Sequence, residues 1–459
     1  MSARDTQAVA VREIRLSKRH ATPSAAALTQ KGGLPGIVFA LIFVVSMAMA
    51  VGNLGLISVM PAIGRAIGIS DHLVAAVFSL SALFWAITAP HWARVSDVRG
   101  RKPMMMLGLG GFVFSMLGCA VVIWAGLQAL LPPFVVFLAF AAIRGVFGLL
   151  GSATASSSQA YVAERTSEKD RTSALSALAG ALGMGTIIGP AVSPLLVFGF
   201  LGLAGPMVVF ALIAAAIWIA VAVVIPSDRP LCAEREAALQ TQAAARRGKT
   251  NDPAAKAGFS VWRDRNIGPY LWFGLLSACA QAINVYTLGF VIMDSMALPA
   301  AQAQRYIGIG MAAGAVAGLV GQWILIPLLK MSPRQLLRAG AVLALAGNLL
   351  TVFAGGIWLL TLGYVVLTLG FSFCRPGFTA GSSLAAGAEQ QGLVAGMVSS
   401  LSGAAIVVTP VIGVLLYEFA PAAPFVLNSA VMAGLTVYAW KNASLRRGEP
   451  DLERASIVS

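Results

Sequence analysis

The chain has 459 residues, of which 58% are apolar and only 11% are charged, and its mean hydropathy is +0.82. Because soluble domains carry about 25% charged residues, this composition excludes an ordinary water-soluble protein and indicates a chain that lies largely in lipid. The formal net charge of +14 could indicate a nucleic-acid partner, unless the basic residues follow another pattern along the chain.

Long apolar runs follow one another along the chain. A helix needs about 20 mostly apolar residues to cross a bilayer, and the sequence contains twelve such runs, rich in Ala, Leu, Val and Gly. They lack the alternation of polar and apolar residues that is typical of a membrane β-barrel, so we predict an all-α membrane protein with twelve transmembrane helices. The predicted spans are residues 36–60, 73–93, 104–126, 134–160, 172–198, 204–226, 268–293, 304–329, 336–354, 357–386, 392–416 and 421–440.

The basic residues gather on one side of the predicted membrane. With the amino terminus in the cytoplasm, 28 of the 32 Lys and Arg residues fall in cytoplasmic segments, which is the positive-inside rule. The basic charge therefore indicates topology and not a nucleic-acid partner. We predict a bacterial-type inner-membrane protein with both termini in the cytoplasm, and the first apolar run is long enough that we expect no cleaved signal peptide.

A long polar stretch divides the predicted helices six to six. It covers residues 227–266, and a weak repeat relates the two halves, because TIIGPAVSPLL resembles VVTPVIGVLLY with Pro190 and Pro410 at matching places. Two pseudo-symmetric six-helix bundles are a transporter architecture. We predict a basic cytoplasmic tail (1–34), an amino-terminal bundle (35–226), a cytoplasmic linker (227–266), a carboxy-terminal bundle (267–442) and a cytoplasmic tail (443–459).

The loop between the second and third predicted helices reads ARVSDVRGRKP. A loop this short places Asp97 against helix ends and arginines, where it can form a clasp that closes one side of the protein. The loop resembles motif A of the major facilitator superfamily, although alanine replaces the first glycine of that pattern. The matching residues are Asp97, Gly100, Arg101 and Lys102.

The fourth predicted helix carries RGVFGLLGSATASSSQAYVAE. Arg144 lies near its middle and resembles motif B of the same superfamily, while Glu164, at its cytoplasmic end, resembles the acid that the family couples to motif A. By helical spacing, Arg144 shares one face with four small or polar residues. These are Gly148, Ser152, Ser156 and Gln159.

The fifth predicted helix carries GTIIGPAVSP, which resembles motif C of the drug–proton antiporters. Gly185, Gly189 and Pro190 match that motif, but Ser-Pro stands where Gly-Gly is usual. A seam of glycine and proline is suited to tight packing or to a hinge. We expect a second flexible point at Pro376 and Gly377 in the tenth helix.

These motifs identify the chain as a member of the major facilitator superfamily, closest in pattern to its twelve-helix multidrug efflux branch. The resemblance implies the major facilitator fold and a monomeric secondary transporter that exports small amphipathic molecules by alternating access, in exchange for protons. It also implies that the chain is not an enzyme and needs no cofactor. Many such exporters carry an acid in the first helix, where this chain has Asn53.

Two arginines, Arg144 and Arg375, lie within predicted spans, but none of the 18 acidic residues lies near the middle of one. An arginine inside the membrane costs about 2.5–3.5 kcal/mol, so an anionic substrate is a plausible partner for these planar, fork-shaped cations. The alternatives are that Arg375 reaches the membrane surface and that Arg144 only ties helices together. Further candidate binding residues are Asn53, Gln159, Gln281, Asn284 and Tyr286.

The carrier of the coupling proton follows less directly from the sequence. Without a deep carboxylate, the candidates are Asp294 and Glu418, at the outer ends of the seventh and eleventh helices. The alternative functions are a dedicated exporter of an anionic metabolite such as a carboxylate siderophore, an importer of organic anions and, more remotely, an intramembrane enzyme. The histidines and cysteines show no catalytic or metal-ligand spacing, so we predict no catalytic site and no metal site.

Overall fold

The computed structural model describes residues 34–226, 262–296, 300–386, 391–442 and 445. Within these ranges, twelve helices are long and apolar enough to cross a membrane. The predicted all-α fold class with twelve spans is therefore confirmed. The predicted tails and most of the predicted linker lie outside the described residues.

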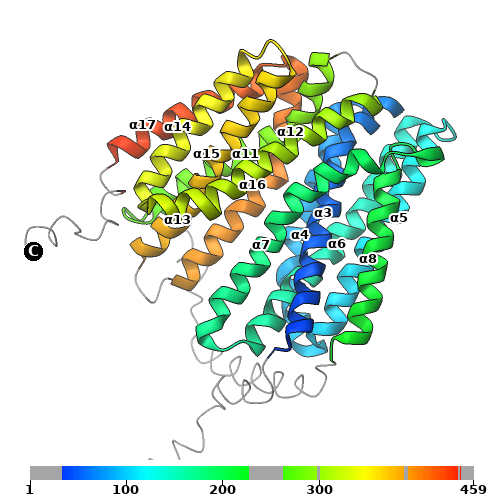
Figure 1. The fold of residues 1–459 in the computed structure, drawn as a ribbon, viewed down its shortest axis with the longest axis horizontal. Coiled ribbons are helices and arrows are strands. Elements are labelled where there is room, and N and C mark those ends of the chain that lie inside the picture. Colours follow the sequence, from blue (N-terminus) through cyan, green and yellow to red (C-terminus); the bar gives the residue numbers. More distant parts are fainter. Residues whose placement is uncertain (1–33, 227–261, 297–299, 387–390, 443–444, 446–459) are drawn as a thin grey trace, which may run out of the picture.

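The first bundle runs from blue to green in Figure 1. Its helices extend beyond several of the predicted spans, because a helix can continue past the apolar core of a bilayer. They are α3 (Gly36–Ile67), α4 (Asp71–Arg99), α5 (Arg101–Leu127), α6 (Pro133–Arg165), α7 (Glu168–Val192) and α8 (Gly205–Val224), with short 3₁₀ turns η1 (Ser193–Leu196) and η2 (Gly199–Leu201) before α8.

The second bundle runs from yellow-green to red beside the first (Figure 1). The α12 helix continues through a π-helical turn, η3, into a last short helical turn, α13. The elements are α11 (Gly268–Met296), α12 (Ala300–Val320), η3 (Gly321–Leu325), α13 (Ile326–Leu329), α14 (Pro333–Val352), α15 (Ile357–Ala385), α16 (Gln391–Phe419) and α17 (Ala423–Lys441).

Local sequence explains where several helices begin and end. Gly68 ends α3 with φ of 87°, a left-handed conformation that glycine adopts without strain. Gly100 separates α4 from α5 with φ of 101°, which explains the need for glycine within the motif A loop. Ser332 and Gln335 form a capping box that begins α14.

Small residues set the distance between neighbouring helices. A methyl group added at Gly370 of α15 would lie 2.4 Å from the backbone nitrogen of Ala344 of α14, and one at Gly108 of α5 would lie 2.7 Å from the carbonyl oxygen of Leu150 of α6. Such close backbone contact is how membrane helices associate without a hydrophobic driving force. Each bundle is thus a tightly packed unit.

The two bundles meet along helices of both. The α4 helix packs against α16, while α3 and α7 pack against α12, and α3 also contacts α11. The α15 helix continues through Pro376 to Ala385, so Arg375 lies inside a membrane-spanning helix and not at its end. The helices along this boundary carry the residues of the candidate site.

Candidate functional site

A cavity that we call the main cavity lies between the two bundles. It has a volume of about 840 Å³ and is lined by α3, α4, α6 and α7 of the first bundle and by α11 and α16 of the second. Its walls are mostly apolar and aromatic. The large residues among them are Met49, Phe78, Trp85, Phe147 and Tyr286.

Arg144 reaches this cavity from the middle of α6. Its side chain is 1% exposed, and its Nη2 atom donates a hydrogen bond to Oδ1 of Asn53 on α3. The guanidinium carbon lies 4.4 Å from the ring centroid of Phe147 and 5.6 Å from that of Phe78, so aromatic faces stabilise the cation. Asn53 thus joins α3 to α6 through the buried arginine.

Two further residues of the α6 face, Gly148 and Ser152, contact α4. A methyl group added at Gly148 would lie 2.4 Å from the carbonyl oxygen of Ser81, and the hydroxyl groups of Ser152 and Thr88 lie 3.0 Å apart. Gln159, at the far end of this face, is exposed but lines neither of the cavities described here. The residues that helical spacing places on one face of α6 therefore have different surroundings, because Gly148 and Ser152 contact α4 while Gln159 is exposed.

A second, smaller cavity of about 170 Å³ lies beside the main cavity. It contains Gln281 and Arg375, while Tyr286 lines both cavities. Arg375 is exposed and forms no hydrogen bond or ion pair with any residue that the structure describes. Asn284 is 1% exposed and lines neither cavity. The structure therefore places the two membrane arginines in neighbouring cavities and not in a single one.

The motif A residues form a clasp at one end of the first bundle, which we define as Asp97, Arg101 and Glu164. The Arg101 guanidinium forms ion pairs with Asp97 and, over 2.7 Å, with Glu164. Lys102 donates a hydrogen bond of 2.7 Å to the carbonyl oxygen of Ala222 near the end of α8. The predicted clasp residues therefore meet, and these contacts join α4, α5, α6 and α8 within one bundle.

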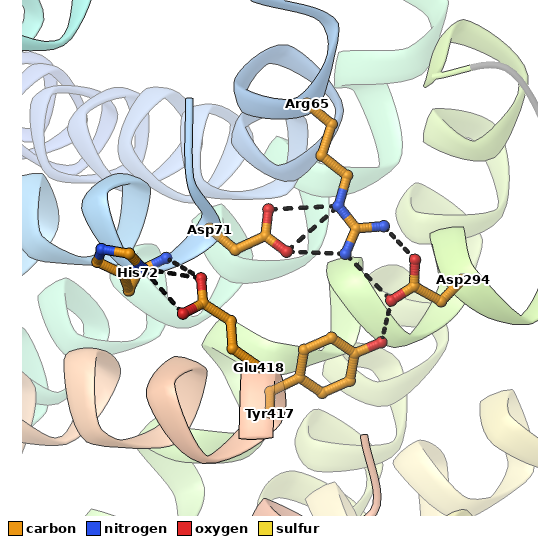
Figure 2. A network of polar contacts seen from close by, with 6 residues as sticks. All are labelled: Arg65, Asp71, His72, Asp294, Tyr417 and Glu418. Atoms are coloured by element: carbon orange, nitrogen blue, oxygen red, sulfur yellow. Dashed lines mark hydrogen bonds and ion pairs between the residues drawn. The ribbon is translucent and has the colours of Figure 1, made fainter. Parts of the chain in front are cut away.

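A network of polar residues joins the two bundles at the end of the molecule opposite the clasp (Figure 2). We call it the bridging network, and it consists of Arg65, Asp71, His72, Asp294, Tyr417 and Glu418. On its right-hand side, Nη2 of Arg65 lies 2.7 Å from Oδ2 of Asp71 and 3.0 Å from Oδ2 of Asp294. The hydroxyl group of Tyr417 also donates a hydrogen bond to Asp294. These contacts connect α3 and α4 of the first bundle with α11 and α16 of the second.

The other side of the bridging network pairs His72 with Glu418 (Figure 2). The backbone nitrogen of His72 donates a hydrogen bond of 3.0 Å to the Glu418 carboxylate, and its ring Nδ1 lies 2.8 Å from Oε2. The sequence had singled out Glu418 and Asp294 but not their partners. Arg65 is one of the two basic residues that the predicted topology places in loops outside the cell. A basic residue on that side was the one feature of the sequence that could have indicated an ion pair there.

The motif C residues lie at close helix contacts. Methyl groups added at Gly185 and Gly189 of α7 would lie 2.3 Å from Cβ of Ala50 and 2.4 Å from the carbonyl oxygen of Val51 on α3. At the end of the motif, Pro194 lies close to α12 of the second bundle, because a methyl group added at Gly308 would lie 2.5 Å from Cγ of Pro194. The motif therefore packs two helices of the first bundle together and continues into a contact with the second.

Two helical bundles that enclose a cavity at their boundary define a membrane transporter. Residues 38–329 match the sequence profile of the Major Facilitator Superfamily, and the chain belongs to this family. It is 26% identical over 398 residues to "Multidrug resistance protein 2" of Bacillus subtilis, covering 84% of this chain and 90% of that protein. It is also 33% identical over 123 residues to "Multidrug resistance protein MdtG" of Yersinia enterocolitica, covering 26% of each.

Solved structures share the fold at low sequence identity. The human organic anion transporter MFSD10 is 18% identical with a TM-score of 0.57, covering 88% of this chain and 98% of that one. The nucleoside transporter NupG is 12% identical with a TM-score of 0.64, and the match covers 89% of this chain and 99% of that one. The predicted membership of the superfamily is confirmed, and the names of the two bacterial relatives support the predicted multidrug efflux branch. The chain is an integral membrane transporter and not an enzyme.

Proposed function

We propose that the chain is a proton-coupled exporter that moves small amphipathic molecules out of the cytoplasm by alternating access. The observation that carries this proposal is the main cavity, which both bundles line while the bridging network joins them at one end. Transporters of this architecture hold the substrate between two halves that rock about a central site. A closed end beside a central cavity fits one state of that cycle.

The charge distribution supports an orientation for this state. The clasp end of the first bundle carries Arg94, Arg99, Arg101 and Lys102, and basic residues favour the cytoplasmic side of a bacterial inner membrane. The bridging network then closes the outer end. A transporter closed toward the outside is ready to take up its substrate from the cytoplasm, as an exporter must be.

The lining of the main cavity supports an amphipathic substrate. Phe78, Trp85 and Phe147 offer aromatic surfaces, and a few polar groups interrupt them, which is the usual composition of a small-molecule site. The names of the two bacterial relatives, both multidrug resistance proteins, favour export over import. A broad apolar cavity fits efflux of several related compounds.

The bridging network supports a role in proton coupling. Asp294 and Glu418 remain the candidate coupling residues, because both join the bundles where outside protons arrive. We add His72, because its backbone nitrogen and its ring Nδ1 contact the Glu418 carboxylate across the bundle boundary.

Two groups of glycine and proline residues are the proposed flexible points of the cycle. Gly185, Gly189 and Pro190 lie where α7 packs on α3, and Pro376 and Gly377 lie inside α15. Proline removes one backbone hydrogen bond from a helix, which lowers the cost of bending there. Bending at these points would let each bundle change its contacts without unfolding.

Transport into inverted membrane vesicles tests the proposal. Vesicles that contain the protein should accumulate a fluorescent amphipathic compound when their interior is acidified, and a protonophore should abolish the accumulation. Vesicles with Asp97→Asn should contain equal amounts of protein and accumulate less. Accumulation that does not respond to the pH gradient would contradict proton coupling, and accumulation only in right-side-out vesicles would contradict export.

A further inference from the structure

Arg144 is a buried cation that lacks a counter-ion. Its Nε and Nη1 atoms are inaccessible to water and form no hydrogen bond among the residues that the structure describes. Together these atoms carry three N–H groups. A buried donor without a partner costs free energy, and a charged donor costs more than a neutral one. A ligand that accepts these hydrogen bonds would therefore recover a large part of that cost.

The cavity around Arg144 offers no acidic side chain of its own. Arg144 is the one charged residue among the described residues that line the main cavity. The described carboxylates near the bundle boundary lie in the bridging network or in the clasp, each already paired with a base. The positive charge is thus available to a substrate and not neutralised by the protein.

The surroundings of the guanidinium group fix how a ligand would approach it. Phe147 and Phe78 lie near the group at 4.4 Å and 5.6 Å from its carbon atom, and Asn53 accepts a hydrogen bond from Nη2. A guanidinium group donates its hydrogen bonds in its own plane, where a carboxylate can accept several at once. The Asn53 amide also carries two N–H donors beside the oxygen that faces Arg144.

We propose that the main cavity selects amphipathic molecules that carry one carboxylate group, held by Arg144 and Asn53 while the apolar part lies against the aromatic walls. This inference specifies the substrate class of the proposed exporter and rests on that proposed function. The volume of about 840 Å³ is within the range of drug-sized sites, which is roughly 300–1,000 Å³. Neutral compounds of the same shape should enter the cavity but leave the arginine unsatisfied.

Equilibrium binding of a matched pair of probes tests the inference. Dansylglycine carries a carboxylate at pH 7.5, and its amide, dansylglycinamide, has the same body without the charge. We expect wild-type protein in nanodiscs to bind the carboxylate about tenfold more tightly than the amide, because hydrogen bonds to charged groups are the stronger ones. Arg144→Gln should remove this preference while changing the affinity for the amide less than about twofold, and Arg144→Lys should retain part of it.

Arg338→Gln is the matched control. Arg338 also lies over an aromatic ring, 5.0 Å from the centroid of Trp440, but it lines neither cavity. This variant should keep the wild-type preference. Equal affinity of the wild-type protein for both probes would overturn the inference, as would an Arg144→Gln variant that weakens both equally. If Arg144→Gln does not fold, two measurements still test the inference. They are the ratio of the wild-type affinities for the two probes and the same ratio for Arg144→Lys.

Binding without any ion gradient separates this inference from the proposed function. A protein that prefers the carboxylate but transports it independently of protons contradicts proton coupling and leaves the anion site intact. A protein that exports cationic or neutral compounds under a pH gradient, without any preference for the carboxylate, contradicts the anion site and leaves the exporter intact.

Discussion

Replacing Asp294 with asparagine should release the outer end of the transporter. Asp294 accepts hydrogen bonds from Arg65 and Tyr417, and these three residues come from α11, α3 and α16. Asparagine has nearly the same shape but no charge, so the variant loses the ion pair with Arg65 and retains at most weaker hydrogen bonds. Arg65 keeps its ion pair with Asp71 on its own bundle, so the loss falls on the contact between bundles.

The size of this effect follows from exposure. The Arg65 and Asp294 side chains are 28% and 45% exposed, so water screens much of their attraction. Ion pairs at such positions contribute about 0–1 kcal/mol, and the hydrogen bond from Tyr417 contributes about 1 kcal/mol more. A loss of about 1–2 kcal/mol changes an equilibrium by a factor of about 5–30. The outward-open state should become more populated by that factor.

Accessibility of one cysteine in the main cavity measures this population. Ser400 lines the cavity from α16, so we would introduce Ser400→Cys after replacing the native cysteines. Those are Cys119, Cys232, Cys279 and Cys374. A membrane-impermeant maleimide added outside intact cells should then label the Asp294→Asn protein about 5–30 times faster than the protein that retains Asp294.

Asp264→Asn is the control for this experiment. Asp264 lies just before the other end of α11, where its carboxylate accepts a hydrogen bond of 2.7 Å from the backbone nitrogen of Asn266. Changing it removes one negative charge but leaves the bridging network intact, so labelling from outside should stay at the reference rate. Unchanged labelling in both Asp294→Asn and Tyr417→Phe would refute the view that this network holds the bundles together.

Three further predictions concern the clasp, the contact of His72 with Glu418, and the second arginine. Asp97→Asn removes one of the two carboxylates that pair with Arg101, so the thermal stability of the protein in detergent should stay near that of the wild type. Transport into vesicles should fall at least about tenfold, and transport at the wild-type rate would contradict the role of the clasp. His72→Gln removes the ring contact with Glu418 between the bundles, so outside labelling of the cavity cysteine at one fixed pH should rise up to about fivefold, and an unchanged rate would contradict this role of the contact. Arg375→Gln should lower carboxylate binding less than about threefold, because Arg375 lines the smaller cavity and not the main cavity; a larger loss than in Arg144→Gln would reverse their roles.

Hydropathy and local motifs predicted the parts of this protein that depend on neighbouring residues in the chain. The twelve spans follow from composition, since each helix must satisfy its own backbone in lipid. The clasp follows from a short loop that brings Asp97 and Arg101 within one helical turn of each other along the chain. The fold and the clasp contacts were therefore available from the sequence.

The bridging network could not be predicted in the same way. Asp294 is 229 positions from Arg65, and Glu418 is 346 positions from His72, so their contacts depend on how the two bundles pack. Helical spacing likewise predicts which residues share one face of α6, but it does not predict which helix packs against that face. Gly148 lets α4 approach closely, so α4 contacts Gly148 and Ser152, while Arg144 lines the main cavity and Gln159 lies outside it.

The proposed anion site at Arg144 would give the membrane potential a direct role in the proposed export. When a monoanion binds Arg144, the pair is neutral; when the anion leaves outward, one negative charge has crossed toward the positive side. That movement gains about 2.3 kcal/mol per 100 mV, a factor of about 50 in the concentration ratio at equilibrium. Proteoliposomes with a valinomycin-clamped potassium diffusion potential and equal pH on both sides should therefore transport dansylglycine toward the positive side. Dansylglycinamide moves no net charge by itself, so its transport should respond less. If both probes respond equally to the potential, the charge that moves belongs to the protein or to a coupled ion, and the carboxylate does not supply it.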